Sequence, residues 1–313
     1  MRVLTIYFIL LLFWQFSFAQ QKSESGIKHS FVISGPKTLE INEDGEVVWE
    51  YRENSRDISK LSNGNYLITY AAKVVEVTPD KKEVWSYVSV TNPELMSAQR
   101  LPNGRTLVTE LGEQPRLVEA DEKGFLKDLI PIYPESYNIH MQTRMSRKLP
   151  NGRYLVPHRI SPFVKEYNKN GKTLRTFRVD IPELGGKNAK NGTFAAVRMQ
   201  DGSTLITLAS GNRMVRFDKK GKVAWQLTNE EMDGQLNDVC GLQVLKNGNY
   251  LVSCYGNQAE DGLKMMEITP EKEVVWTYQN PEVRYVHTFQ VLSTNGGKER
   301  ARDGRYNPKP LSP

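Results

Sequence analysis

The chain has 313 residues, of which 39% are hydrophobic and 25% are charged, and its formal net charge is +6. This length is too great for a minimal domain. The positive charge is mild and spread along the chain, without the dense basic tract that nucleic-acid binding usually needs, so we expect no nucleic-acid partner.

Residues 1–19 have the pattern of a signal peptide. Arg2 gives a positive start, residues 3–16 are mostly apolar, and Ser17-Phe18-Ala19 places small residues at the −3 and −1 positions before Gln20. The apolar run is too short for a membrane span, and no later stretch approaches one. We therefore expect an exported protein, periplasmic or secreted, with no membrane span.

One turn motif recurs along the rest of the chain. It is written Asn63-Gly64, Asn103-Gly104, Asn151-Gly152, Asp201-Gly202 and Asn247-Gly248, with a weaker copy at Asn295-Gly296. The copies lie about 40 to 50 residues apart, which is the period of a β-propeller blade. Asn-Gly accepts the positive φ angles of tight hairpin turns, so each copy predicts a hairpin. We therefore predict one closed ring instead of two domains.

The termini are predicted to share one blade. Residues 37–51 have the pattern of an outer hairpin without an inner partner, whereas residues 286–292 have the pattern of an inner strand whose blade then stops. Joined, they close the ring and remove an exposed sheet edge. We predict an all-β, six-bladed β-propeller over residues 27–296, followed by a loose, charged and Pro-rich tail at 297–313.

The fifth repeat shows most clearly the four strands that we expect in a blade. We expect strands at 241–245, 250–254, 264–268 and 273–278. The outer strand carries Trp276, and three other repeats place Trp49, Trp85 and Trp225 alike, whereas the second and third blades have no such Trp. We expect this Trp to pack against the next blade, because a blade cannot bury its faces alone. A stacking surface for a ligand is the alternative.

The repeat also carries a family resemblance. The phrase L-P-N-G-R-T-L at residues 101–107 and the phrase D-G-E-V-V-W-E-Y at residues 44–51 resemble the repeat of PQQ-like propellers. Among these, the chain looks most similar to the six-bladed propeller of bacterial arylsulfotransferases. The resemblance covers nearly the whole mature chain.

Candidate site residues gather where loops enter the innermost strands. The position seven residues before the turn holds Arg56, Met96, Arg144, Phe194 and Cys240, with His287 at the matching place in the last repeat. Seven residues after the turn stand Tyr70, Glu110, His158, Leu208 and Cys254, while Arg159 follows His158 and His140 precedes the third blade. Three of the four histidines thus fall near one channel mouth.

Arginine and histidine at one mouth favour an anionic ligand. A guanidinium binds carboxylate or sulfate with two parallel hydrogen bonds, and a histidine moves protons or acts as a nucleophile near neutral pH. We take His287, His158 and Arg144 as candidate catalytic residues. The candidate ligand-binding residues are Arg56, His140, Arg159, Glu110, Tyr70 and Cys240. In the alternative interpretation, the arginines only pair with Asp57, Glu110 or Asp238 to hold blades together, and His158 is structural.

Several functions fit these residues. The arylsulfotransferase resemblance implies that His287 takes up a sulfuryl group, with Arg144, His158 and Arg56 stabilising charge. We expect no counterpart of the extra N-terminal domain of those enzymes, which weakens this implication. A polysaccharide lyase would use Arg144 to neutralise a uronate, His158 or His287 as base and Tyr70 as acid. A non-catalytic scaffold for proteins or carbohydrates is the third hypothesis.

Cofactors, assembly and the two thiols complete the expectations. We expect no cofactor and no metal, because His140, His158, His287 and Glu110 lack close ligand spacing. The partner is then an anionic small molecule or a glycan, bound by a monomer. Cys240 and Cys254 flank one predicted hairpin, where either a disulfide or two packed thiols would fit.

Overall fold

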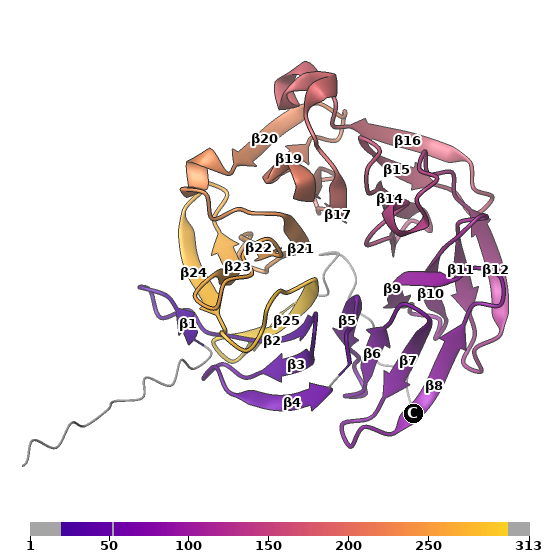
Figure 1. The fold of residues 1–313 in the computed structure, drawn as a ribbon, viewed down its shortest axis with the longest axis horizontal. Coiled ribbons are helices and arrows are strands. Elements are labelled where there is room, and N and C mark those ends of the chain that lie inside the picture. The colour runs from indigo at the N-terminus through magenta and orange to yellow at the C-terminus, as the bar shows by residue number, and fades with distance from the viewer. Residues whose placement is uncertain (1–19, 52, 300–313) are drawn as a thin grey trace, which may run out of the picture.

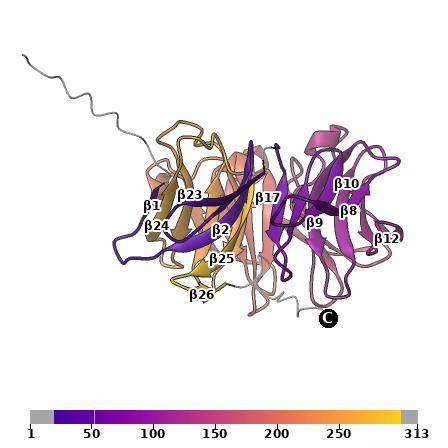
Figure 2. The ribbon, with the colours of Figure 1, turned by 90° about the horizontal axis from the view of Figure 1, so that it is seen from below.

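Six antiparallel sheets stand around a central axis and form a six-bladed β-propeller (Figure 1). Seen from the side, the ring is a disc that is wider than it is tall (Figure 2). The structure is a computed structural model that describes residues 20–51 and 53–299. The predicted signal peptide at 1–19 and most of the predicted tail, residues 300–313, lie outside the described residues.

Each blade is a meander whose first strand lies nearest the axis. Blade one contains β5 (Asp57–Lys60), β6 (Tyr66–Thr69), β7 (Lys73–Val77) and β8 (Glu83–Val88); blade two contains β9 (Glu94–Arg100), β10 (Thr106–Leu111), β11 (Arg116–Ala120) and β12 (Leu126–Pro131). Blade three contains β13 (Arg147–Lys148), β14 (Tyr154–His158), β15 (Phe163–Tyr167) and β16 (Thr173–Arg178); blade four contains β17 (Thr193–Arg198), β18 (Thr204–Leu208), β19 (Arg213–Phe217) and β20 (Val223–Thr228). Blade five contains β21 (Val239–Val244), β22 (Tyr250–Cys254), β23 (Leu263–Ile268), β24 (Val274–Gln279) and, at its outer edge, β1 (Gln20–Lys22).

The helical content of the described residues consists of single turns, four in loops between blades and one, η4, between β18 and β19 of blade four. They are the 3₁₀ helices η1 (Ile139–Met141), η2 (Pro182–Leu184), η3 (Gly186–Asn188), η4 (Ala209–Gly211) and η5 (Glu230–Met232). Among the described residues, no helix has the length and apolar composition needed to cross a membrane.

Both ends of the chain build blade six, as predicted. Its sheet runs β26 (Gly297–Lys298), β25 (Thr288–Thr294), β2 (His29–Ser34), β3 (Thr38–Ile41) and β4 (Val47–Tyr51), so the C-terminal strands sit inside three N-terminal ones. The prediction omitted β2, which is buried on both faces and therefore shows no alternation of apolar and polar residues. It also placed residues 297 and 298 in the tail, whereas they pair with β25.

The N-terminal arm adds a fifth strand to blade five and joins it to blade six. β1 pairs with β24, and the side-chain amide of Gln21 lies between the two blades. Its Oε1 accepts hydrogen bonds from Trp276 Nε1 (3.0 Å) and the His29 amide (2.9 Å), while its Nε2 donates to the carbonyls of Asn42 (3.0 Å) and His29 (2.9 Å). One side chain thus satisfies four polar groups at this junction.

The repeated tryptophans join neighbouring blades. Each indole N–H donates to a carbonyl in the outer turn of the next blade: Trp49 to Pro79 (2.9 Å), Trp85 to Asp121 (3.0 Å) and Trp225 to Pro270 (2.8 Å). At the junction between blades five and six, the Trp276 indole N–H donates to the Gln21 side chain instead of to a carbonyl of the next blade. The predicted structural role of the Trp is confirmed.

A second repeated contact between blades is ionic. A Glu on the third strand of one blade meets a cation that stands three residues before the turn of the next blade. The pairs are Glu40 with Lys60 (2.7 Å), Glu76 with Arg100 (2.6 Å), Glu119 with Lys148, and Glu166 with Arg198 (2.8 Å). In blade five, Glu267 pairs with His29 (2.7 Å) instead. Four of these five carboxylates are buried and that of Glu40 is 12% exposed, so a partner is needed to offset their desolvation.

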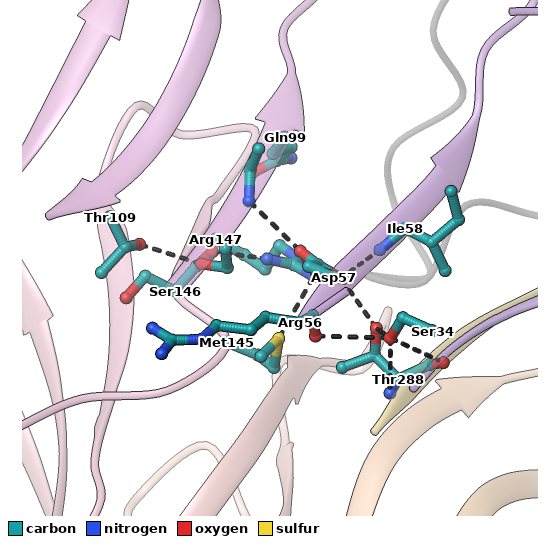
Figure 3. Close-up of polar contacts among 12 residues, drawn as sticks. Ser34, Arg56, Asp57, Ile58, Gln99, Thr109, Met145, Ser146, Arg147 and Thr288 are labelled. Atoms are coloured by element: carbon teal, nitrogen blue, oxygen red, sulfur yellow. Dashed lines mark hydrogen bonds and ion pairs between the residues drawn. The ribbon is translucent and has the colours of Figure 1, made fainter. Parts of the chain in front are cut away.

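A buried carboxylate near the axis connects four blades (Figure 3). Asp57, at the start of β5, accepts hydrogen bonds from Arg147 Nη2 (2.8 Å), Thr288 Oγ1 (3.0 Å) and the Ala98 amide (3.2 Å). These groups come from blades three, six and two. The Asp57 side chain is 1% exposed and that of Arg147 is 8% exposed. This cluster places the loops that enter the innermost strands.

Candidate functional site

The segments that enter the innermost strands meet at one end of the central axis, and we call this end the channel mouth. The position seven residues before the turn does gather side chains from different blades there. The Phe194 ring meets His287 edge to face at 5.0 Å between centroids, and the Arg144 guanidinium lies 5.9 Å from the Phe194 centroid. Met96, Phe194 and Cys240 pack together in one buried apolar cluster beneath them.

Arg144 is a buried member of the group of side chains at this mouth, which we call the channel-mouth cluster. Its Nη1 donates to the carbonyls of His140 (2.5 Å) and Thr143 (2.8 Å), but its buried Nε makes no hydrogen bond with the described residues. Burial, and then repulsion from Arg159, lower the pKa of Arg144 to about 9. The guanidinium therefore stays charged at neutral pH in a place that disfavours its charge.

Arg159 and Asp238 form the second part of the cluster. Arg159 Nη1 donates to Ser210 Oγ (2.7 Å), and its Nη2 lies 3.7 Å from Asp238 Oδ1. The buried Oδ1 of Asp238 accepts no hydrogen bond from the described residues, and the side chain as a whole is 32% exposed. Burial raises the pKa of Asp238 despite Arg159 and Arg144. Its φ of 45° is left-handed, which is uncommon outside glycine and holds the side chain beside Arg159.

Arg56 and His140 share one carboxylate. Arg56 Nη1 donates to Glu94 Oε2 (2.9 Å) and to the Leu95 carbonyl (2.9 Å), and His140 Nδ1 lies 3.0 Å from the same Glu94 oxygen. Burial opposes the charge of Glu94, but the contacts with His140 and Arg56 hold its pKa below the usual value. Glu94 is therefore an acceptor at neutral pH.

His287 is the one histidine of the mouth whose tautomer is fixed by the backbone. Its Nδ1 lies 2.8 Å from the Arg56 carbonyl, so Nδ1 carries the proton and donates it. Burial, aided by Arg144 and Arg56, lowers the pKa of His287 to about 4. The ring is neutral at pH 7, and its Nε2, which makes no hydrogen bond with the described residues, is left as an acceptor.

Three predicted site residues lie outside this cluster. His158 is fully buried, with Nδ1 3.0 Å from Glu135 Oε2 and Nε2 3.0 Å from the Tyr167 hydroxyl. Glu110 is fully buried and accepts from Arg116 Nε (2.7 Å). Tyr70 is buried in the apolar cluster that includes Ile68. All three lie at or beside the end of the second strand of a blade: His158 ends β14, Glu110 is the last residue but one of β10, and Tyr70 follows β6. This strand lies behind the innermost strand and is covered by it.

The two cysteines are both free and buried. Cys240 belongs to the channel-mouth cluster, where burial raises the pKa of its thiol well above the usual value, and burial raises that of Cys254 to about 12. Both are therefore protonated and inert at neutral pH. Within the part of the chain that the structure describes, no group of three or more His, Cys, Asp or Glu side chains could hold a metal ion.

Four residues of the cluster were not among the predicted ligand-binding residues. They are Glu94; Asp238, which the sequence suggested only as a partner of an arginine; Tyr255, whose ring lies 5.9 Å from that of His287; and Tyr285, whose ring lies 4.6 Å from that of Tyr255. Glu94 and Asp238 each stand nine residues before their turn asparagines, Asn103 and Asn247. Tyr255 stands eight residues after Asn247, as Arg159 does after Asn151. Extending the alignment by one strand period, from seven to nine residues before the turn, would have found the acidic pair.

The chain is similar in fold to several solved propellers. A protein of unknown function from Bacteroides caccae is 21% identical with a TM-score of 0.72, over 84% of this chain and 98% of that one. A catalytically inactive histidine-to-alanine variant of virginiamycin B lyase from Staphylococcus aureus, solved with quinupristin, is 12% identical with a TM-score of 0.58, over 90% and 97%. The WD40 β-propeller domain of Doa1 is 13% identical with a TM-score of 0.53, over 79% and 77%.

These likenesses define the class of the molecule, a six-bladed β-propeller, and at such identities they show the fold alone. No protein-family model and no curated protein matches the chain.

Proposed function

We propose that this propeller is an exported protein that binds an anionic small molecule or glycan, bearing a carboxylate or a sulfate, at the channel mouth. The observation that carries the proposal is an excess of positive charge. Three guanidinium groups, of Arg56, Arg144 and Arg159, share the cluster with only two carboxylates, of Glu94 and Asp238.

The arginines differ in their access to a ligand. The side chains of Arg56 and Arg159 are 18% and 11% exposed, so they can reach a bound anion, whereas Arg144 is 4% exposed and acts from beneath through its charge. Burial and the neighbouring Arg159 and Arg56 disfavour the charge of Arg144 in the free protein. An anion between them relieves both effects, which makes its binding favourable.

Turnover is the second part of the proposal, and it depends on His287. Its Nε2 lone pair could attack the sulfur of a sulfate ester as the ester S–O bond breaks, or it could accept a carbon-bound proton next to a uronate carboxylate. The propeller lyase that is inactive as a histidine-to-alanine variant is a precedent for lyase chemistry on this fold. His158 and Tyr70 have no part in this mechanism, because both are covered.

A thermal-shift titration tests the binding. Sulfate, glucuronate and uncharged glucose are added to the purified protein and to an Arg159→Met variant. A ligand at 100 times its Kd stabilises the protein by about 2.7 kcal/mol. We expect the two anions, but not glucose, to raise the Tm of the wild type, and Arg159→Met to weaken this effect.

The matched control is Arg178→Met, which removes an arginine from β16 whose side chain is 55% exposed and pairs with Asp180. It should bind anions as the wild type does. The proposal is wrong if no anion raises the Tm, or if the two Arg variants lose the response equally.

A further inference from the structure

Two tyrosines form a wall beside the arginines of the channel mouth. The Tyr255 and Tyr285 rings lie 4.6 Å apart between centroids with an interplanar angle of 43°, and Tyr255 meets the His287 ring at 5.9 Å. Both side chains are half-buried. Neither hydroxyl makes a hydrogen bond with the described residues. We call this pair the tyrosine wall.

The backbone holds the tyrosine wall in place. The Tyr255 amide donates to the Asp238 carbonyl (3.2 Å), which places the main chain of Tyr255 next to the residue that pairs with Arg159. On the other side, a Cβ on Gly35 would lie 2.4 Å from the Tyr285 carbonyl oxygen, so only glycine allows this close approach. The wall is therefore set before a ligand arrives, which lowers the entropy cost of binding.

The polar groups around the wall match a ring with hydroxyl groups. The Asp238 carboxylate accepts no hydrogen bond, Glu94 is an ionised acceptor, and the tyrosine hydroxyls have no partner among the described residues. A sulfate ion has no donor to offer these acceptors. A sugar ring offers hydroxyl donors and a C–H face that packs on an aromatic ring, while a carboxylate on the same ring would reach Arg159 and Arg56.

We propose that the ligand is a hexuronate unit of a glycan, with its ring stacked on the tyrosine wall and its carboxylate on Arg159 and Arg56. This inference rests on the proposed anion site and narrows its ligand class. Asp238 then accepts a hydrogen bond from a ring hydroxyl, so its left-handed backbone conformation places a carboxylate that recognises the ligand. An aromatic sulfate would use the wall and the arginines but would leave the Asp238 carboxylate without a hydrogen-bond donor.

Calorimetric titration with three probes tests the inference. Digalacturonate carries ring, hydroxyls and carboxylate; gluconate carries carboxylate and hydroxyls without the ring; and 4-nitrophenyl sulfate carries a ring and an anion without hydroxyls. We expect digalacturonate to bind at least about tenfold more tightly than either of the others, which is the scale of one good aromatic contact.

Variants of the wall separate stacking from hydrogen bonding. Tyr255→Ala should remove the advantage of digalacturonate over gluconate, whereas Tyr255→Phe should keep most of it and also shows that the site still folds. The control is Tyr137→Ala, which truncates a tyrosine that is fully exposed in the loop before η1. This control should bind all three probes as the wild type does.

The outcomes distinguish the two proposals. If gluconate binds as well as digalacturonate and its binding still needs Arg159, the proposed anion site is supported, but the proposal that the ligand is a hexuronate ring is wrong. Preference for 4-nitrophenyl sulfate, or an unchanged preference in Tyr255→Ala, also overturns the inference. If none of the three probes binds, both proposals fail.

Discussion

Replacement of Asp57 by alanine should destabilise the whole ring, although only one short side chain is lost. The carboxylate is 1% exposed and accepts from Arg147, Thr288 and the Ala98 amide, so one residue connects blade one to blades two, three and six. In Asp57→Ala, the buried Arg147 guanidinium loses its counter-charge, and the Thr288 hydroxyl and the Ala98 and Ile58 amides lose an acceptor.

The magnitude follows from this geometry. Removing one partner of a buried, hydrogen-bonded ion pair typically costs about 3–5 kcal/mol, because the remaining charge stays desolvated. Much of this cost belongs to the stranded guanidinium. Asp57→Ala in an Arg147→Met background should therefore cost at least about 1 kcal/mol less than it does in the wild type.

Urea unfolding followed by tryptophan fluorescence measures both values, since Trp49, Trp85, Trp225 and Trp276 all lie at blade junctions. Asp44→Ala serves as the control, because its ion pair with Lys28 is exposed and should contribute nothing measurable. If Asp57→Ala costs less than about 1 kcal/mol, or if the two replacements are additive, the assignment of Asp57 as the central connection is refuted.

Three further predictions concern the junctions and the mouth. Gln21→Ala should lower the free energy of unfolding by about 1–3 kcal/mol in urea titration, since it leaves the Trp276 indole without its acceptor, whereas the exposed neighbour change Gln20→Ala should have little effect. Trp225→Phe loses one indole hydrogen bond and should lower the Tm measurably, by the equivalent of about 0.5–1.5 kcal/mol. The pKa of His287 is lowered from 6.5 to about 4, so its neutral form contributes stability above pH 6.5 that is lost on acidification toward pH 4; in His287→Asn, the Tm should fall less steeply over that window.

The repeat made the architecture predictable, because each turn needs glycine at a positive φ and each outer strand needs a residue to join the next blade. Gly64, Gly104, Gly152, Gly202 and Gly248 all have positive φ, as the turn motif requires. β2 escaped prediction for the opposite reason: a strand buried on both faces lacks the alternation that marks a strand in sequence.

The candidate site was most predictable at the start of the strand nearest the axis, and His140 and Arg159 were the sequence candidates from outside that strand. Arg56 and Arg144 were found by counting seven residues back from the turn, and His287 was found by matching residues 290–292 to residues 243–245. Seven residues after the turn, the same counting reaches a strand that its neighbour covers, where His158 pairs with Glu135. The partner that each candidate side chain contacts depends on which blade is its neighbour in the ring. A single sequence does not give that information without the fold.

The most direct test of the anion site is the titration of His287 observed by NMR through its ring protons, with His287→Asn used to assign the signal. In the free protein, its pKa should be near 4. A carboxylate or sulfate held by Arg159 and Arg56 places negative charge beside the ring, so saturating glucuronate or sulfate should raise this pKa clearly. An unchanged pKa at high concentrations of both anions would contradict the account, because it would mean that no anion binds next to His287.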